Sequence, residues 1–315
     1  MIKEKILIFG TGQIGSFYLD YFKKKNLAVK AIEPDIRDIK KAERAINSFK
    51  PSVVINVAAL TNLEECSQKK AEAFEVNVLG ADNLAQICDQ QSIYFIHFSS
   101  GCIFQSKNQN DAKKEDDLPN PAAYYAWTKV WSEQLIQFNK SPDFKYLILR
   151  PRQPISSKLD YKNTLVKFLT FTKFIDVPNT VTILEDLMDW TFQLIKKKPI
   201  GVFHVANSGF TTPFRAALLL KKHILPSLDV NKIFKQELNK LTPNKRVDTI
   251  LNIDKLKKIG IKPRRLEERL EQIIIGLKKN IERASQSEVR KQLEKAVAQS
   301  KTRTIVNEAW RDLIK

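Results

Sequence analysis

The first half of the chain alternates short apolar runs with longer amphipathic segments. Nearly continuous apolar runs predict strands at residues 5–9, 28–32, 53–57, 93–98 and 146–149. Helical spacing of apolar residues predicts helices at 13–25, 38–49, 71–90 and 122–138. Buried strands that alternate with helices of this length are typical of a parallel sheet covered on both faces. We therefore predict an α/β fold with a Rossmann-type, doubly wound parallel sheet and a dinucleotide-binding domain over residues 1–150.

The pattern loosens after residue 150. Frequent prolines predict a smaller, C-terminal substrate-binding lobe over residues 151–275, with some of its segments returning to the Rossmann domain. Residues 276–315 are charged and helical, and their apolar residues recur at i, i+4 spacing. They are Val289, Leu293 and Val297, then Ile305, Ala309 and Leu313. We expect a helical extension of one or two amphipathic helices. They either pack on the body of the protein or join copies of the chain, so the sequence leaves open whether the protein is a homo-oligomer.

Composition is that of an ordinary globular protein, 315 residues long and 43% hydrophobic. The sequence has no apolar run of 18 residues, so we expect no membrane span. The first strand begins almost at once, without the features of a signal peptide, which indicates a cytoplasmic protein. Three cysteines, Cys66, Cys88 and Cys102, are too few and too scattered for a disulfide framework or a zinc site. We predict no metal site.

The net charge of +18 is the unusual feature. A strongly basic chain can bind nucleic acid or an anionic surface. Here the lysines are spread along the whole sequence and form no basic stripe interleaved with aromatic residues. We therefore favour a lysine-rich composition together with attraction of an anionic substrate, and we expect no nucleic-acid partner.

A glycine motif follows the first predicted strand and opens the first predicted helix. It reads Gly10-Thr-Gly12-Gln13-Ile14-Gly15. In this position the first glycine allows a tight turn, the second lets a pyrophosphate approach the backbone, and the third lets helix and strand pack closely. The free N–H groups of the helix N-terminus then face the phosphates. The motif predicts a dinucleotide site.

The residues after the second strand bear on which nicotinamide is bound. An acidic side chain there usually bonds the adenosine ribose of NAD, whereas an arginine accepts the 2′-phosphate of NADP. Glu33 and Asp35 favour NAD, and Arg37 favours NADP. The sequence leaves NAD and NADP both open.

Tyr125 and Lys129 lie four residues apart in a predicted helix and so share a face. A tyrosine with an ordinary pKa near 10 is a poor acid–base group at neutral pH, and a nearby ammonium is expected to lower that pKa. Ser99 and Ser100 directly follow the strand at 93–98. A serine there can bond the same carbonyl oxygen that the tyrosine protonates, which indicates carbonyl reduction.

Together these motifs resemble the extended short-chain dehydrogenase/reductase superfamily. Within it, residues 5–275 resemble the dTDP-4-dehydrorhamnose reductase family, and in particular its bifunctional nucleotide-rhamnose synthase/epimerase-reductase branch. The matching runs include Asn56-Val-Ala-Ala59, Asn77, Ser100-Gly-Cys-Ile-Phe104, Arg150-Pro-Arg-Gln-Pro-Ile-Ser-Ser157 and Asp176-Val-Pro-Asn179.

The resemblance implies two reactions on one dTDP- or UDP-linked 4-keto-6-deoxy sugar. In the reduction, Tyr125 would protonate the oxygen at C4, Ser100 would polarise the ketone, and Lys129 would hold the nicotinamide ribose. In a 3,5-epimerisation, protons beside the ketone are removed and returned on the other face, which needs a positioned acid–base pair. By resemblance that pair is Cys102 and Lys167.

Further roles follow from the same resemblance. Ala58, Ala59 and Asn77 would lie at the cofactor. Arg150 and Arg152 could bind the substrate diphosphate or form structural ion pairs, because a guanidinium suits either. We interpret the histidines as structural. Two other functions stay open: another sugar-nucleotide epimerase or dehydratase with tightly held NAD, and a non-catalytic regulatory subunit that keeps the nucleotide fold.

Overall fold

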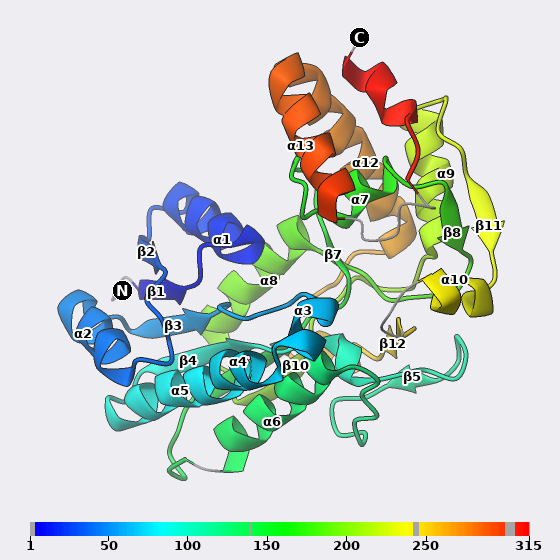
Figure 1. The fold of residues 1–315 in the computed structure, drawn as a ribbon. Helices are drawn as coiled ribbons and strands as arrows, with labels where there is room; N and C mark the ends of the chain where they lie inside the picture. The colour runs from blue at the N-terminus through cyan, green and yellow to red at the C-terminus, as the bar shows by residue number, and fades with distance from the viewer. Residues whose placement is uncertain (1–3, 139, 242–245, 300–305, 315) are drawn as a thin grey trace.

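The computed structural model describes residues 4–138, 140–241, 246–299 and 306–314. Its described residues form a six-stranded parallel sheet in the order β10-β6-β4-β3-β1-β2 (Figure 1). The strands are β1 (Lys5–Phe9), β2 (Ala28–Ile32), β3 (Val53–Asn56), β4 (Tyr94–Phe98), β6 (Tyr146–Arg150) and β10 (Gly201–His204). The predicted doubly wound α/β fold is confirmed, and β10 shows that part of the chain beyond residue 150 returns to the sheet.

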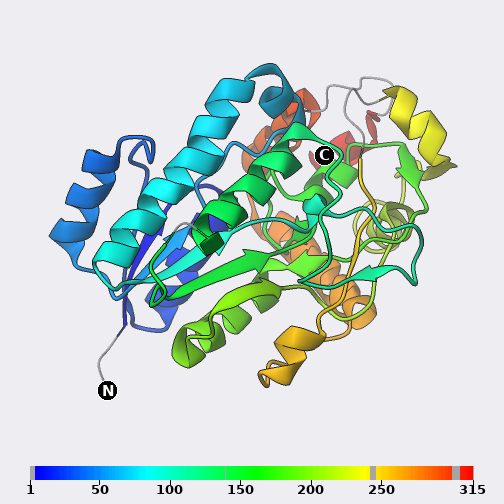
Figure 2. The ribbon, with the colours of Figure 1, turned by 90° about the horizontal axis from the view of Figure 1, so that it is seen from below.

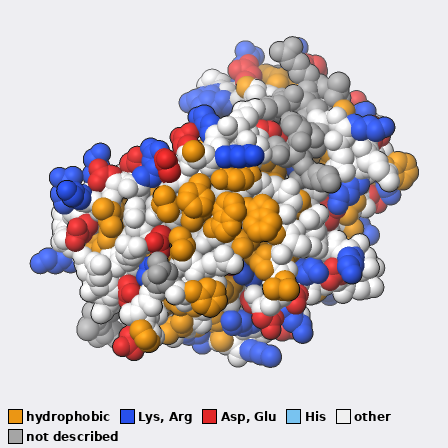
Figure 3. Space-filling model, turned by 60° about the horizontal axis from the view of Figure 1, so that its bottom comes forward, with side chains coloured by type: hydrophobic (Ala, Val, Ile, Leu, Met, Phe, Trp, Pro, Cys, Tyr) orange, Lys and Arg blue, Asp and Glu red, His pale blue; other side chains and the backbone are white. Residues whose placement is uncertain are grey.

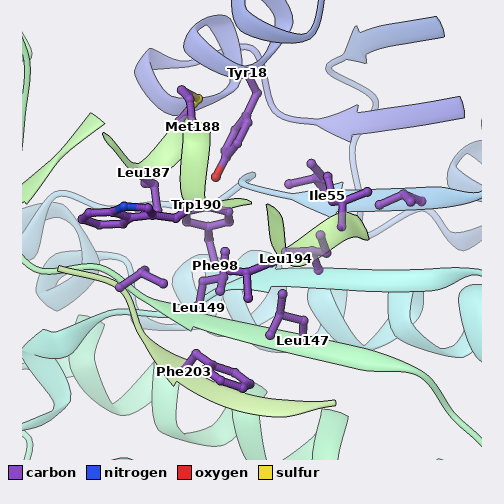
Figure 4. Packing of buried hydrophobic residues seen from close by; sticks show 14 of the residues in the cluster. Tyr18, Ile55, Phe98, Leu147, Leu149, Leu187, Met188, Trp190, Leu194 and Phe203 are labelled. Atoms are coloured by element: carbon purple, nitrogen blue, oxygen red, sulfur yellow. The ribbon is translucent and has the colours of Figure 1, made fainter. Parts of the chain in front are cut away.

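Alternating side chains of the strands supply two separate cores. Ile6 and Ile8 of β1 point into one apolar cluster, and Leu7 and Phe9 point into another on the opposite face. Figure 4 shows the first cluster, where Trp190 lies among strand side chains. Because both faces are apolar, each face needs a helical layer.

Helices supply those two layers (Figure 2). One face is covered by α1 (Gln13–Lys24) and α8 (Leu184–Lys197). The other is covered by α2 (Ile39–Phe49), α5 (Gly80–Gln90) and α6 (Tyr124–Phe138). These bounds match the predicted helices except in the segment 71–90.

That segment is helical but not uniformly α-helical. It runs through α4 (Lys70–Phe74), a π-helical turn η1 (Glu75–Leu79) and α5, with a short α3 (Leu63–Gln68) before it. A π turn widens the helix locally and is often found at functional sites. Asn77 lies within it.

The second lobe has its own apolar cluster, distinct from those at the sheet. It is built largely from short elements. The small paired strands are β5 (Ala112–Lys113) with β12 (Ile250–Leu251), β7 (Pro154–Ile155) with β9 (Thr182–Ile183), and β8 (Lys173–Ile175) with β11 (Asn231–Ile233). The helices are α7 (Thr164–Phe168), α9 (Pro213–His223), α10 (Lys235–Leu241) and α11 (Asp254–Lys258).

The C-terminal extension packs on this lobe. It comprises the end of α12 (Leu266–Arg283), α13 (Gln286–Gln299) and η4 (Ala309–Ile314). The expected boundary at 275/276 falls inside α12, so the lobe and the extension share one continuous helix. Of the apolar positions that recur at i, i+4 spacing, Val289 and Leu293 are buried. Ile305 lies outside the described residues.

Charges are spread over the surface. On the face shown in Figure 3, Lys and Arg side chains are scattered among acidic ones, and hydrophobic side chains gather near its centre. Among the described residues, no helix has the length and apolarity needed to cross a membrane.

Candidate active site

The glycine loop lies where the strand order reverses, between the carboxyl ends of β1 and β3. Gly10 adopts φ +106°, and a Cβ there would lie 2.9 Å from the backbone nitrogen of Ala58. A Cβ on Gly15 would lie 1.9 Å from the carbonyl oxygen of Gly10. Both glycines are therefore required by the fold itself. In doubly wound sheets, ligands bind in the crevice at this reversal.

Gly12 differs from the other two glycines. A Cβ there would meet nothing within 4 Å, and it caps α1 without a side-chain hydrogen bond. The next residue, Gln13, has a buried side-chain amide nitrogen without a hydrogen-bond partner among the described residues. Free donors and open space at a helix N-terminus fit a bound diphosphate. Ile14 packs against the neighbouring apolar cluster.

Two asparagines shape the rest of this crevice. The Asn56 side-chain oxygen accepts a hydrogen bond from the Ala58 nitrogen (3.1 Å), which fixes the turn that leads to Ala59. Asn77, in the π turn, accepts from the Leu60 nitrogen (2.7 Å) and donates to the Leu60 carbonyl oxygen (2.9 Å). These hydrogen bonds fix the chain that leads from the end of β3 through Ala58 and Ala59 to Leu60, beside the glycine loop.

The residues after β2 form an ion-pair cluster. The guanidinium of Arg37 binds both carboxylate oxygens of Asp35 (2.7–3.0 Å) and also Glu75 (3.2 Å). The contact with Arg37 lowers the pKa of Asp35. Glu33 is exposed. Arg37 is therefore already neutralised by carboxylates, and an added phosphate must compete with Asp35 for it.

Ser100, Tyr125 and Lys129 come together at the carboxyl end of β4. Ser100 caps the short η2 (Gly101–Ile103) by accepting from the Cys102 nitrogen (3.1 Å), and its side chain is close enough to the Tyr125 phenol to oppose the rise in its pKa. The Lys129 ammonium is buried, donates to the Phe98 carbonyl oxygen (2.9 Å), and lies 5.9 Å from the centre of the Tyr125 ring. The structure therefore assembles the group expected for carbonyl reduction.

One electrostatic expectation is corrected. Lys129 was expected to lower the pKa of Tyr125, but burial raises the pKa of this phenol, and Lys129 is not among the causes of the shift. The reason is geometric, since the ammonium donates to the Phe98 carbonyl instead of the phenol. Burial also lowers the pKa of Lys129 to about 8. At neutral pH Tyr125 therefore keeps its proton, which suits a general acid.

Cys102 is half-buried in η2, beside this group. Arg152 donates to its sulfur from Nη1 (3.1 Å) and to the Asn179 side-chain oxygen from Nη2 (2.7 Å). Arg152 is itself buried, with only 5% of its surface exposed. Its guanidinium therefore holds the Cys102 sulfur and the Asn179 side chain together.

Lys167 lies on the short α7 of the lobe. Burial and the charge of Arg246 lower the pKa of its ammonium. Arg246 binds Glu64 of α3 (2.9 Å) and so links the lobe to the Rossmann domain. Among the described residues, no hydrogen bond or ion pair joins Lys167 to Cys102; the two residues lie on different elements, α7 and η2.

The expectation that Arg150 binds substrate is corrected. Arg150 is 4% exposed and pairs with Glu133 through Nε (2.8 Å) and Nη2. Its Nη1 donates to the Glu115 carbonyl (3.0 Å) and contacts His204 Nε2 (3.3 Å). Because these donors are engaged and water is excluded, Arg150 forms a structural ion pair, which was the alternative to binding the substrate diphosphate.

Two relevant residues, Glu133 and Arg246, escaped sequence reasoning, and Asn179 entered it only as part of a matching run, without a role. Glu133 lies four residues after Lys129, a spacing that could have suggested a role. Arg246 carries no comparable signal, because its partner Glu64 is 182 residues away. The histidines are structural as expected; His97, for example, contacts Asn56 and is fully buried.

Comparison with known proteins places this geometry among sugar-nucleotide enzymes. Residues 4–278 match the family described as RmlD substrate binding domain. A bifunctional dTDP-4-dehydrorhamnose 3,5-epimerase/dTDP-4-dehydrorhamnose reductase of Arabidopsis thaliana is 29% identical over 262 residues, which cover 80% of this chain and 86% of the relative. The chain spans 39% of the length of trifunctional rhamnose-forming relatives of the same plant.

Solved structures show the same fold. A UDP-rhamnose synthase of Acanthamoeba polyphaga mimivirus superposes with a TM-score of 0.79 at 24% identity, covering 87% of this chain and 99% of that one. A dTDP-4-dehydrorhamnose reductase of Bacillus anthracis, in complex with NADP, superposes with a TM-score of 0.78 at 21% identity over the same shares. The family match, residues 4–278, includes every candidate site residue and ends before most of the C-terminal extension.

Proposed function

The chain belongs to the RmlD substrate-binding domain family, and on this basis we propose that it reduces a dTDP- or UDP-linked 4-keto-6-deoxy sugar to a rhamnose-type sugar nucleotide. The observation that carries the proposal is the meeting of Ser100, Tyr125 and Lys129 at the carboxyl end of β4, on the edge of the sheet where the glycine loop lies. The names of the relatives support the substrate class.

The residues present fit a nicotinamide dinucleotide, which when bound supplies hydride to C4 of the sugar. The loop around Gly12 would hold the diphosphate, with Ala58, Ala59 and Asn77 beside it. The Lys129 ammonium donates one of its three N–H groups to the Phe98 carbonyl oxygen, and the other two could bind a ribose hydroxyl. The NADP-bound relative supports NADP, and Asp35 supports NAD, so the proposal covers both.

Tyr125 acts as the general acid of the reduction. As C4 gains hydride, the carbonyl electron pair moves onto O4, and the phenolic proton passes to that oxygen. The Ser100 hydroxyl donates to the same oxygen and lowers the cost of the developing charge. The phenolate then recovers a proton from water. The raised pKa of Tyr125 keeps its proton available at neutral pH.

We extend the proposal to epimerisation at C3 and C5. The ketone makes these protons acidic, and one group must remove each proton while another returns one to the opposite face. Cys102 and Lys167 are the proposed pair. What supports them is the hydrogen bond that fixes the Cys102 sulfur and the lowered pKa of Lys167, which makes its amine easier to deprotonate.

The decisive experiment separates the two reactions. The protein is incubated in D2O with dTDP- or UDP-4-keto-6-deoxyglucose, with and without NADPH or NADH. We expect oxidation of the reduced cofactor when a sugar nucleotide and a cofactor are both present. When the cofactor is omitted, we expect deuterium to enter C3 and C5 of the sugar. Neither exchange nor cofactor oxidation with any of these substrates would reject the proposal.

Variants assign the acid. Tyr125→Phe removes the proton donor, so reduction should fall by about 10²-fold or more, a typical loss for a general acid. Tyr124→Phe is the matched control, because the Tyr124 ring packs on Trp131. Full reduction by Tyr125→Phe would refute its role.

We also infer a cytoplasmic protein, which the free thiols of Cys66, Cys88 and Cys102 support. A homo-oligomer stays a prediction. A small-molecule substrate, rather than nucleic acid, remains the proposed partner.

A further inference from the structure

The C-terminal extension packs directly on the helix that carries Lys167. Residues 279–315 lie beyond the family match, which ends at residue 278. In the structure, Val289 and Leu293 of α13 share one apolar cluster with Leu165 and Val166 of α7. Figure 1 shows α13 beside α7, and the C-terminal η4 beside α13. The extension therefore packs against the helix that carries a proposed site residue.

Hydrogen bonds from the extension fix the chain on both sides of α7. Before the helix, the Gln292 side-chain oxygen accepts from the Tyr161 nitrogen (2.8 Å). After it, Asn307 donates from its backbone nitrogen to the Thr170 carbonyl (2.9 Å) and from Nδ2 to the Phe171 carbonyl (2.7 Å). These bonds hold backbone atoms, so they set the path of the segment between them.

The α7 helix needs such support because it is only five residues long. A single helical turn is not stable by itself in water, since its few hydrogen bonds do not offset the cost of ordering the backbone. The Lys167 carbonyl accepts from the Thr170 hydroxyl (2.8 Å), and Thr170 is the residue that Asn307 holds. A short chain of hydrogen bonds thus connects Asn307 to the backbone of Lys167.

We propose that the C-terminal extension is a brace that positions Lys167, with Gln292 and Asn307 as its positioning residues. The effect of the brace on epimerisation rests on the proposed function, whereas its effect on the position of Lys167 does not. Misplacing a proton-transfer group by about 1 Å can reduce a rate by about 10²-fold. The brace therefore acts on proton exchange more than on reduction, which uses Ser100 after β4 and two groups on α6.

The electrostatics of Lys167 supply a readout of its position. Burial, Arg246 and Lys162 lower the pKa of its ammonium, and Asp160 raises it. When α7 loosens, water reaches the ammonium, and the burial contribution shrinks. The pKa of Lys167 then rises toward its ordinary value near 10.4.

Two variants weaken the brace at separate points. Asn307→Ala removes the bond to Phe171, and Gln292→Met removes the acceptor for Tyr161 while keeping side-chain length. Glu308→Gln is the matched control, because Glu308 is exposed and pairs only with Arg311 among the described residues. Circular dichroism checks that each variant folds, and Gln292→Met carries the test where Asn307→Ala does not fold.

Two measurements test the brace. The first is acetylation of Lys167 by acetic anhydride against pH, followed by peptide mass spectrometry, which needs no activity. The second compares deuterium exchange into the 4-keto sugar nucleotide with reduction of the already epimerised 4-keto-rhamnose nucleotide. We expect the acetylation midpoint of Lys167 to rise in both variants, and exchange to fall about ten-fold while reduction changes less than about two-fold. Glu308→Gln should match the wild type.

An unchanged acetylation midpoint in a folded brace variant overturns the inference, as does an equal fall of exchange and reduction. If the wild type neither exchanges nor reduces, yet the midpoint still rises in the variants, the proposed function fails and the brace stands.

Discussion

Arg152 donates a hydrogen bond to the sulfur of Cys102 over 3.1 Å, although the two residues are 50 positions apart in the sequence. The same guanidinium binds the Asn179 side chain and the Val247 carbonyl oxygen. One buried cation therefore joins the proposed proton-transfer cysteine to two other parts of the lobe. Its loss should affect both chemistry and stability.

Arg152→Lys tests that arrangement. A lysine keeps the charge but has no planar fork, so it cannot reach all three acceptors. Acceptors left unpaired in a buried site should lower the unfolding free energy by about 2–3 kcal/mol, measured by urea denaturation. Deuterium exchange should fall more than reduction. Arg265→Lys, at an exposed arginine, is the control, and the proposed role of Arg152 fails if both substitutions have equal effects on exchange.

The glycine loop allows a contrast between two substitutions. In Gly15→Ala, the new Cβ collides with the Gly10 carbonyl oxygen, so we expect a loss of about 1–3 kcal/mol of stability. In Gly12→Ala, the Cβ meets open space, so thermal unfolding should match the wild type. It should nevertheless weaken binding of NADPH or NADH, measured by fluorescence titration. Unaltered cofactor binding by Gly12→Ala would contradict the assigned pyrophosphate site.

Asp35 is expected to control cofactor preference through Arg37. Asp35→Asn removes the charged carboxylate that binds Arg37, which leaves Glu75 as its carboxylate partner and makes the guanidinium more available to a 2′-phosphate; it also replaces a charged acceptor for a ribose hydroxyl with a neutral one. Because a hydrogen bond to a charged group contributes about 1.5–3 kcal/mol, the ratio of kcat/KM for NADPH over NADH should rise at least about ten-fold. Glu33→Gln serves as the comparison. A ratio that changes only in Glu33→Gln would assign the ribose contact to Glu33 instead.

His204 should make the protein less stable in acid. Its Nδ1 donates to the Asn252 carbonyl and its Nε2 accepts from Arg150, which requires a neutral ring. Burial lowers the pKa of His204 to about 3, against about 6.5 in the unfolded chain. Between these values the unfolded state binds a proton that the folded state does not, so stability falls as pH drops below 6.5.

The matching experiment compares wild type with His204→Gln by urea denaturation at pH 7.5 and pH 5. Between these pH values the unfolding free energy of the wild type should fall by up to about 2 kcal/mol more than that of the variant. The figure follows because pH 5 lies about 1.5 pH units below the unfolded-state pKa of about 6.5. Equal losses in both proteins would show that His204 is not kept neutral by the fold.

The sequence by itself determined the sheet and the phosphate loop. Both depend on local information: apolar runs such as residues 5–9 become buried strands, and the spacing of Gly10, Gly12 and Gly15 encodes a turn and a helix start. The Tyr125 and Lys129 pair was also readable, because i, i+4 residues share a face of any helix. These features need no knowledge of distant contacts.

Only the tertiary structure decided what surrounds those residues. Glu133 pairs with Arg150, so this arginine is not available to bind substrate. Arg246 pairs with Glu64, which lies 182 residues earlier in the sequence. No local pattern records such partners. The raised pKa of Tyr125 is likewise a result of burial, which depends on how the whole chain packs. Sequence fixes spacing along one element, whereas charge, burial and the support of Lys167 arise where separate elements meet.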